Sequence, residues 1–238
     1  MSFYSVVIPA YNEEEYIGRC LESLVRQNTN MKFEVIVVDN GSTDGTVRIA
    51  ETFHDRLALS VAHEEMKSRG AARGKGFSLA KGDIILSTDA DTEVPSDWIE
   101  RMTEAFSNAR VVATTGTCHI EDQSALSNSI FNMIQPIAMV LHRMVFGAYW
   151  LTGSNFAIRK STYRESGGFD ASRKSQEDTE LGHRVKKLGV IRIIRSASVR
   201  TSGRRFKKNI IVGLLDYAIN FIKQYALRIK NLDMDDVR

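Results

Sequence analysis

Short apolar runs alternate with segments of helical periodicity along the first half of the chain. Apolar runs of strand length predict β-strands at residues 4–8, 33–38, 57–63, 83–86 and 111–117. Apolar residues three or four positions apart predict helices at 13–27, 70–80 and 97–106, and a further helix ends at Phe53. Strands that alternate with helices at this interval predict an α/β fold with a mostly parallel central sheet flanked by helices.

This alternation ends near residue 120. Residues 124–146 form a long, apolar-rich helical stretch around Pro136, which is expected to kink a helix. The remaining pattern predicts a strand at 153–159, a turn at Gly167-Gly168, a helix at 177–188, a short strand at 190–194 and an amphipathic helix at 206–231. No repeat or low-complexity linker separates these segments. We therefore expect one domain, residues 1–238, with halves at 1–119 and 120–206 and a C-terminal helix and tail at 207–238.

Polar turns follow three of the predicted strands. They comprise residues 9–11 (PAY), 39–40 (DN) and 89–91 (DAD). The carboxyl ends of parallel strands meet at one edge of a sheet, where such folds bind their ligands. The three turns are therefore expected to converge on one site.

Carboxylates dominate the third of these turns. Asp89 and Asp91 stand one residue apart at the end of an apolar strand, and Glu93 follows. Carboxylates packed together repel one another, and a divalent cation completed by a nucleotide diphosphate would remove that conflict. Alternate strand residues lie roughly 6.5 Å apart, so both aspartates can bind one ion only if the chain turns there. The pattern favours one direct metal ligand and one carboxylate that acts through water or ribose.

Composition narrows the class of partner. The chain is 43% hydrophobic and 26% charged, as in a soluble globular protein, and its net charge of +3 is too small to indicate a nucleic-acid partner. The charge is uneven, because no acidic residue stands between Glu180 and Asp216. The basic residues of that segment are Arg184, Lys186, Lys187, Arg192, Arg195, Arg200, Arg204, Arg205, Lys207 and Lys208. Such a run is a solvated face, or it binds a diphosphate or an anionic membrane surface.

The cysteines and the apolar segments indicate the compartment. Cys20 and Cys118 have neither metal-ligand spacing nor the pattern of a disulfide framework, which favours a reducing, cytoplasmic location. No basic segment precedes the first strand, so we expect no signal peptide. No clear membrane span is expected either, although residues 130–151 come nearest to one. Contact with a membrane would then be peripheral, at its cytoplasmic face.

Several motifs, in this order and spacing, resemble the family 2 glycosyltransferases. They are residues 5–13 (SVVIPAYNE), 34–46 (EVIVVDNGSTDGT), 70–73 (GAAR), 82–91 (GDIILSTDAD), 167–170 (GGFD), 177–178 (ED) and 202–205 (SGRR). The resemblance implies the A-type, Rossmann-like fold of nucleotide-diphospho-sugar transferases. Residues 1–119 would bind the nucleotide sugar, and residues 120–206 would face the acceptor.

The resemblance also implies an activity, namely inverting, metal-dependent transfer of a single sugar from a nucleotide-diphosphate sugar to a hydroxyl or phosphate acceptor. Mn²⁺ or Mg²⁺ would be the cofactor. A UDP-sugar is the expected donor, although one carboxylate can accept a hydrogen bond from uracil, thymine or guanine. The acceptor would be a glycan or a lipid-linked molecule. Gly74 and Phe206 depart from the common asparagine and tryptophan, and the glutamine motif of processive synthases is missing.

Site residues follow from the same motifs. The resemblance places Pro9, Tyr11, Glu13, Asp39, Arg73, Asp89, Ala90, Arg204 and Arg205 around the nucleotide sugar. It places Gly153, Gly168 and Glu177 on the acceptor side, Asp178 as the catalytic base, and Asp91, Asp89 and Glu93 at the metal.

Each assignment has a structural alternative. Asp39 would instead stabilise its turn through the amides of Asn40 and Gly41. Arg73 would be an exposed helix arginine, and Arg204 and Arg205 would belong to the solvated basic run. Glu177 and Asp178 would stabilise a helix N-terminus through its dipole.

Two other functions use similar features. A catalytically inactive module that binds a nucleotide sugar or a membrane surface would not need Asp178. A nicotinamide-dependent oxidoreductase would share the sheet, but the turn after the first strand lacks the Gly-x-Gly-x-x-Gly pattern.

Overall fold

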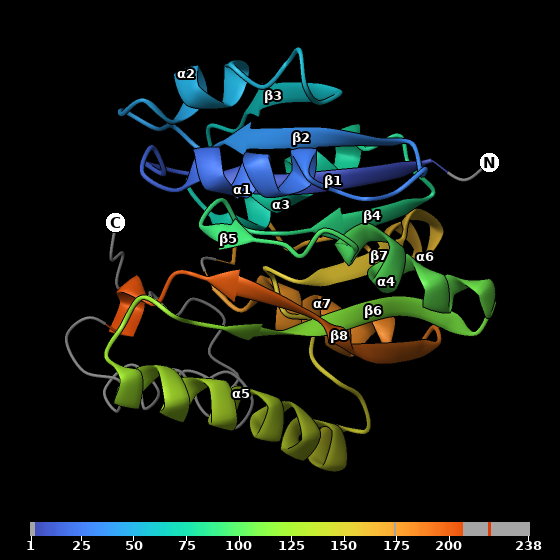
Figure 1. The fold of residues 1–238 in the computed structure, drawn as a ribbon. Coiled ribbons are helices and arrows are strands. Elements are labelled where there is room, and N and C mark those ends of the chain that lie inside the picture. The colour runs from blue at the N-terminus through green and yellow to red at the C-terminus, as the bar shows by residue number, and fades with distance from the viewer. Residues whose placement is uncertain (1–2, 174, 207–218, 220–238) are drawn as a thin grey trace.

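The computed structural model describes residues 3–173, 175–206 and 219, and it confirms the α/β class (Figure 1). The strands are β1 (Tyr4–Ala10), β2 (Phe33–Asp39), β3 (Leu59–His63), β4 (Ile84–Ser87), β5 (Thr92–Glu93), β6 (Val111–His119), β7 (Phe156–Arg159) and β8 (Val190–Thr201). The helices are α1 (Ile17–Val25), α2 (Thr46–Glu51), α3 (Arg69–Leu79), α4 (Trp98–Glu104), α5 (Ala125–Phe146), α6 (Lys160–Glu165) and α7 (Glu177–Val185), with 3₁₀ turns η1 (Ala105–Ser107) and η2 (Arg204–Phe206).

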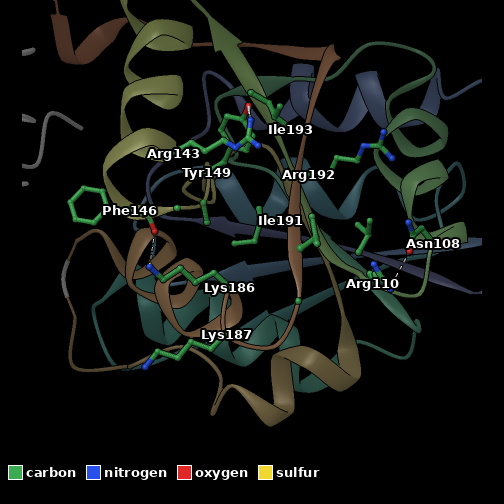
Figure 2. A pocket seen from close by; sticks show the side chains of 15 residues that line it. Asn108, Arg110, Arg143, Phe146, Tyr149, Lys186, Lys187, Ile191, Arg192 and Ile193 are labelled. Carbon is green, nitrogen blue, oxygen red and sulfur yellow. Dashed lines mark hydrogen bonds between the residues drawn. The ribbon is translucent and has the colours of Figure 1, made fainter.

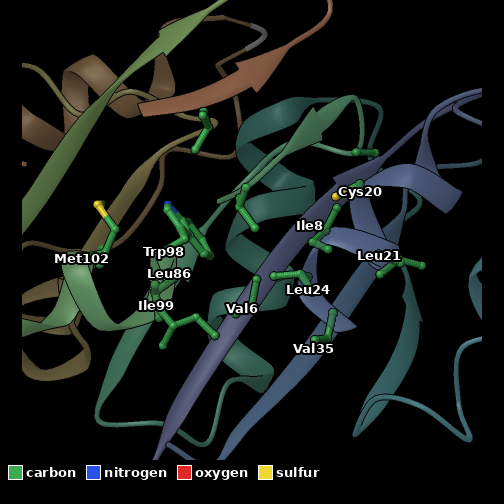
Figure 3. Packing of buried hydrophobic residues seen from close by; sticks show 14 of the residues in the cluster. Val6, Ile8, Cys20, Leu21, Leu24, Val35, Leu86, Trp98, Ile99 and Met102 are labelled. Atoms are coloured by element: carbon green, nitrogen blue, oxygen red, sulfur yellow. The ribbon is translucent and has the colours of Figure 1, made fainter. Parts of the chain in front are cut away.

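The eight strands form one sheet in the order β3-β2-β1-β4-β7-β6-β8-β5. The first four are mutually parallel, as the near-continuous apolar runs predict for strands covered on both faces. Successive residues of β1 enter opposite layers of the core. Val6 and Ile8 pack in the layer that also contains Leu21 of α1 and Trp98 of α4, as Figure 3 shows. Val7 packs in the other layer, with Phe77 of α3.

Strand β7 joins the two halves of the chain. It lies antiparallel between β4 and β6, with Leu86 opposite Ala157 and Thr114 opposite the same Ala157. Strand β8 then runs parallel to β6, and β5 closes that edge of the sheet by pairing with the end of β8. Strands from residues 1–119 and from residues 120–206 therefore alternate within one sheet.

Several predicted boundaries are wrong. Strand β8 continues past residue 194 to Thr201, because its polar second half pairs with β6 and then with β5. Helix α1 begins at Ile17 rather than residue 13, because Glu13 and Glu14 donate their amides to the side chains of Thr46 and Asp44. The elements β5 and α6 were not predicted. The helix predicted at 206–231 lies outside the described residues, apart from Phe206 and Ile219.

The long helix α5 was predicted with almost the observed bounds. It runs through Pro136 and ends at Gly147, which takes a left-handed conformation with φ of 76°. Among the described helices, α5 alone has the length and apolar content of a membrane span. The sequence had indicated no clear span, because Asn132, Gln135 and Arg143 interrupt this segment.

Candidate active site

The edge at which β1, β2 and β4 end holds the predicted polar turns. Ala10 at the end of β1 lies opposite Asp39 at the end of β2, and Asp89 follows β4. Segments from the second half of the chain reach the same edge. They contribute Gly153, the start of α7 and the turn η2, which contact the turn residues as described below.

Arg73 ties three elements together at this edge. Helix α3 begins after Ser68, whose Oγ accepts a hydrogen bond from the Ala71 amide, and Arg73 lies one turn into the helix. Its buried guanidinium donates to Asp89 Oδ1 and to Glu177 Oε1. The alternative of an exposed helix arginine is therefore wrong, and Glu177 orients the Arg73 guanidinium.

Asp178 lies beside this group and is held by backbone amides. Its Oδ2 accepts from the Gly153 amide at 2.7 Å, and its Oδ1 accepts from the Thr179 amide at 2.6 Å. A Cβ atom on Gly153 would lie 2.7 Å from both Arg73 Nη2 and Asp178 Oδ2. Only glycine leaves room for the arginine and the aspartate to lie together.

Burial and neighbouring charges shift the pKa of Asp178. Burial, followed by repulsion from Glu177, raises the pKa of Asp178 from 3.8 to about 6, against the opposing effects of Arg73 and of the amides of Thr179 and Gly153. A carboxylate with a pKa near 6 is ionised at neutral pH, yet it is a stronger base than an ordinary aspartate. This pKa suits a group that accepts a proton from an attacking hydroxyl.

A second charge group is built around Arg204. Its guanidinium donates to both oxygens of Glu13, at 2.5 and 2.8 Å, and lies 3.0 Å from Asp91 Oδ2. It also stacks over the ring of Tyr16. Arg204 is only 11% exposed, so its alternative assignment to a solvated basic face is wrong. The side chain of Arg205 lies outside the described part of the chain.

The predicted metal ligands are not grouped as a set of three. Asp91 is near the hydroxyls of Thr92 and Thr201, Asp89 binds Arg73, and Glu93 pairs with Arg200 at 2.6 Å. No cluster of three or more His, Cys, Asp or Glu side chains able to hold a metal occurs among the described residues. Each of the three carboxylates is paired with an arginine, so their assignment to one metal ion stays a prediction. Asp91 fits a divalent cation as a single carboxylate ligand, with further oxygens to come from a diphosphate.

The nucleotide side of the edge contains Asp39 and Tyr11. The Asp39 carboxylate accepts hydrogen bonds from the amides of Gly41 and Ser42, and its Oδ2 lies 3.3 Å from His63 Nδ1. Asp39 therefore stabilises its turn, although the second amide is that of Ser42 and not, as predicted, that of Asn40. The ammonium of Lys67 lies 5.1 Å from the centre of the Tyr11 ring. Pro9 lies in β1 beside Val38 of β2. Ala90 is buried in the core layer beneath the turn.

Gly168, predicted on the acceptor side, forms part of a loop. Among the described residues it makes no contact with Asp178. It has φ of 70°, its carbonyl accepts from Arg184 at 2.6 Å, and a Cβ there would lie 3.0 Å from the Tyr163 hydroxyl. The same loop packs on the start of α3, because Ser68 Oγ donates to the Ala171 carbonyl.

Sequence reasoning missed three residues at the site. Ser87 accepts from Arg73 Nε at 3.4 Å and donates to the Gly153 carbonyl at 3.0 Å, so it links the two. Asn12 and Gln176 adopt left-handed backbone conformations, with φ of 51° and 55°. Each immediately precedes a site carboxylate. Asparagine tolerates this conformation, which offered a signal at Asn12, whereas a glutamine offers none.

A family model described as glycosyl transferase family 2 matches residues 5–167, which is more than half of the chain. The chain belongs to glycosyl transferase family 2. The match covers Glu13, Asp39, Arg73 and Asp91. It confirms the resemblance carried by the sequence motifs.

Curated relatives include several glycosyltransferases. The family 2 chain is 39% identical over 115 residues to glycosyltransferase AglE of Haloferax volcanii, covering 47% of this chain and 38% of AglE. It is 38% identical over 103 residues to the poly(ribitol-phosphate) beta-N-acetylglucosaminyltransferase TarS of Staphylococcus aureus, covering 42% of this chain and 18% of TarS. The probable glycosyltransferase YdaM of Bacillus subtilis is 29% identical over 199 residues, which cover 78% of this chain and 47% of YdaM. The chain spans less than half the length of each of these relatives.

Solved structures share the fold. The mannosyltransferase PcManGT from Pyrobaculum calidifontis, in complex with GDP-Man and Mn²⁺, superposes with a TM-score of 0.71 at 24% identity, over 98% of this chain and 65% of its own. TarS 1–349 of S. aureus, in complex with UDP-GlcNAc, gives a TM-score of 0.67 at 23% identity, over 85% of this chain and 58% of its own. These likenesses confirm the Rossmann-like fold of nucleotide-sugar transferases.

Proposed function

We propose that this family 2 chain transfers a single sugar, with inversion, from a nucleotide-diphosphate sugar to a hydroxyl or phosphate acceptor. The observation that carries the proposal is the group formed by Arg73, Asp89, Glu177 and Asp178. Three segments distant in sequence, α3, the turn after β4 and the start of α7, bring these side chains together at the carboxyl edge of the sheet. One carboxylate of this group has a raised pKa, which is the property required of a general base.

Asp178 is the proposed base. Inversion in one step requires a carboxylate that takes the proton of the acceptor hydroxyl while its oxygen attacks the anomeric carbon. The amides of Gly153 and Thr179 fix the orientation of the Asp178 carboxylate. Arg73 holds the Glu177 side chain beside Asp178, and repulsion from Glu177 contributes to the raised pKa of Asp178.

Charges at the donor side fit a diphosphate. Arg204 offers a planar guanidinium, which binds phosphate oxygens through two parallel hydrogen bonds. Asp91 would hold Mn²⁺ or Mg²⁺, which when bound would neutralise charge on the departing diphosphate. Glu13 keeps Arg204 at this place through two hydrogen bonds.

For the donor, we propose a UDP-sugar first and a GDP-sugar second, since related structures contain UDP-GlcNAc and GDP-Man. For the acceptor, we propose a glycan or lipid-linked molecule, reached at the cytoplasmic face of a membrane. The basic run from Arg184 and the apolar helix α5 support this location.

The test is thermal stabilisation by uridine, guanosine and thymidine diphosphates, each with and without Mn²⁺ or Mg²⁺. A ligand at a hundredfold excess over its Kd adds roughly 2.7 kcal/mol to the free energy of unfolding, which gives a measurable rise in Tm. We expect a rise with one base, dependent on metal and lost in Asp91→Ala. The exposed Asp55→Ala is the matched control and should retain it. No rise with any nucleotide would refute the proposal for the isolated chain.

A further inference from the structure

A cavity of about 920 Å³ lies away from the candidate active site (Figure 2). It is bounded by the end of α5, the end of α7 and the start of β8, whereas the active site lies near the far end of β8. None of the lining residues is among those assigned to the candidate site, and Lys186, at the end of α7, follows Asp178 by eight residues, about 12 Å along the helix. The cavity is therefore separate from the proposed nucleotide-sugar site.

Cations line this cavity around an apolar floor. The basic side chains are Arg110, Arg143, Lys186, Lys187 and Arg192, and no aspartate or glutamate is among the lining residues. None of these five takes part in an ion pair with a described carboxylate. Tyr149 and Ile191 contribute to the floor. We call this site the cationic cavity.

An apolar stripe on α5 leads into the cationic cavity. It consists of Leu126, Met133, Ile137, Leu141, Met144 and Val145, which recur at helical spacing and are all more than half exposed. Met144 and Val145 are 76% and 73% exposed, and they follow Arg143 at the cavity wall. The opposite face of α5 packs inward through Phe131 and Met139. The helix thus joins an exposed apolar face to a cluster of positive charge.

We favour one kind of partner because it matches both features over the length of the helix. An anionic lipid surface offers hydrocarbon to the apolar stripe and phosphate groups to the cations. A nucleic acid would match the cations but not the exposed methionines and leucines. A second copy of the chain would match the apolar stripe, but the cationic cavity offers no carboxylate to pair with the cations of its partner.

We propose that α5 lies in the plane of an anionic membrane surface, with the apolar stripe among the lipid chains and the cationic cavity on the phosphate groups. This inference deepens the peripheral location within the proposed function, on which its biological role rests. The docking itself does not require catalysis. Phe131 near the start of α5 packs against Phe206, two residues after Arg204, so one end of the docked helix would lie beside the active site.

The test is flotation of the full chain with vesicles of equal parts phosphatidylglycerol and phosphatidylcholine, compared with pure phosphatidylcholine. We expect binding to the anionic vesicles and its loss at high salt. Leu141→Glu with Met144→Glu should weaken binding about 100-fold. Leu79→Glu, an exposed leucine at the end of α3, is the matched control and should leave binding unchanged.

A second pair of variants tests the charges. Lys187→Gln with Arg192→Gln should weaken binding about 30-fold. Lys32→Gln with Lys75→Gln removes the same charge from exposed positions elsewhere and should change it little. Each variant's nucleotide-induced rise in Tm is measured separately, so a failure of the membrane inference is distinguishable from a failure of the proposed transferase function.

Three results would overturn the inference. One is absence of flotation with anionic vesicles in a folded chain, and another is flotation unchanged by the Leu141 and Met144 substitutions. The third is self-association of the wild-type chain, abolished by those substitutions, without vesicle binding. That result would assign the apolar stripe to contact between copies.

Discussion

At the scale of single residues, two arginines of the site are each paired with two carboxylates. Arg73 is shared by Asp89 and Glu177, and Arg204 is shared by Glu13 and Asp91. Removing one partner of a buried ion pair leaves the other charge uncompensated, which costs about 3–5 kcal/mol. Substitutions of the arginines will therefore disturb folding as well as binding, and the carboxylate Asp178 gives a cleaner probe of chemistry.

Asp178→Asn keeps the size of the side chain and removes its basicity. We expect sugar transfer to fall by about 10²–10⁴-fold while the nucleotide-induced rise in Tm is retained. The measurements are transfer or slow donor hydrolysis, together with thermal stabilisation by the nucleotide. Asp55→Asn serves as the control for loss of a carboxylate. Full activity of Asp178→Asn would favour the alternative of a non-catalytic binding module.

The raised pKa of Asp178 predicts the pH dependence of the reaction. The base must be ionised, so kcat/KM should decline about tenfold per pH unit below pH 6. A profile recorded from pH 5 to 8 checks this expectation. A rate that is flat down to pH 5 would contradict the assignment of Asp178 as the base.

The same pKa predicts an effect on stability with a defined sign. The folded chain binds a proton at Asp178 more readily than the unfolded chain, since the pKa rises from 3.8 to about 6. The stability from this group is therefore fully present below pH 3.8 and is lost as the pH rises through 6. Asp178→Asn should remove this contribution, so the difference in Tm between variant and wild type should change between pH 4 and pH 7. A constant difference in Tm would contradict the shift.

At the scale of elements, close approach of α3 to the segment before β7 creates the site. Gly153→Ala would bring a methyl group against Arg73 and Asp178, so we expect a lower Tm and a large loss of transfer. Gly74→Ala is the matched control in α3, because a Cβ there meets only Phe169, at 3.8 Å. It should stabilise the chain by about 0.5–1 kcal/mol through helix propensity. Thermal unfolding and transfer assays of both variants decide between these outcomes, and equal effects would refute the steric argument.

The sequence predicted the elements whose own residues specify them. Strands β1, β2 and β4 are mostly apolar, and α5 has a cap at Ser124, so each could be located locally. The second half of β8 and the short helix α6 are polar, and partner strands or packing rather than periodicity define them.

The sequence predicted which residues form the candidate site but not which of them contact one another. Motifs placed Arg73, Asp89, Glu177 and Asp178 at one site, and the structure brings them together. Local sequence carries no information on the pairing of Arg73 with Glu177, which are 104 positions apart. For the same reason, the sequence did not predict that Glu93 pairs with Arg200. Arg200 lies in the second half of β8, and the sequence pattern predicted that this strand ends at residue 194.

At the scale of the whole molecule, interleaved strands predict cooperative unfolding. Trp98 packs in the core layer that contains Val6 and Ile8 of β1, whereas the ring of Trp150 lies against His142 of α5, and they are the two tryptophans of the sequence. In Trp98→Phe and in Trp150→Phe, the fluorescence of the remaining tryptophan should give the same midpoint as far-UV circular dichroism. Separate midpoints within one variant would show that the halves unfold independently.

The position of β7 also limits how such enzymes diversify. Because β7 lies between β4 and β6, a fragment of residues 1–119 alone would leave the edge of β4 without its neighbour. Exchange of the two halves of the chain between relatives must therefore preserve a strand register, from Ile84 opposite Arg159 to Ser87 opposite Phe156. Diversification is then more accessible through substitution of loops than through recombination of halves.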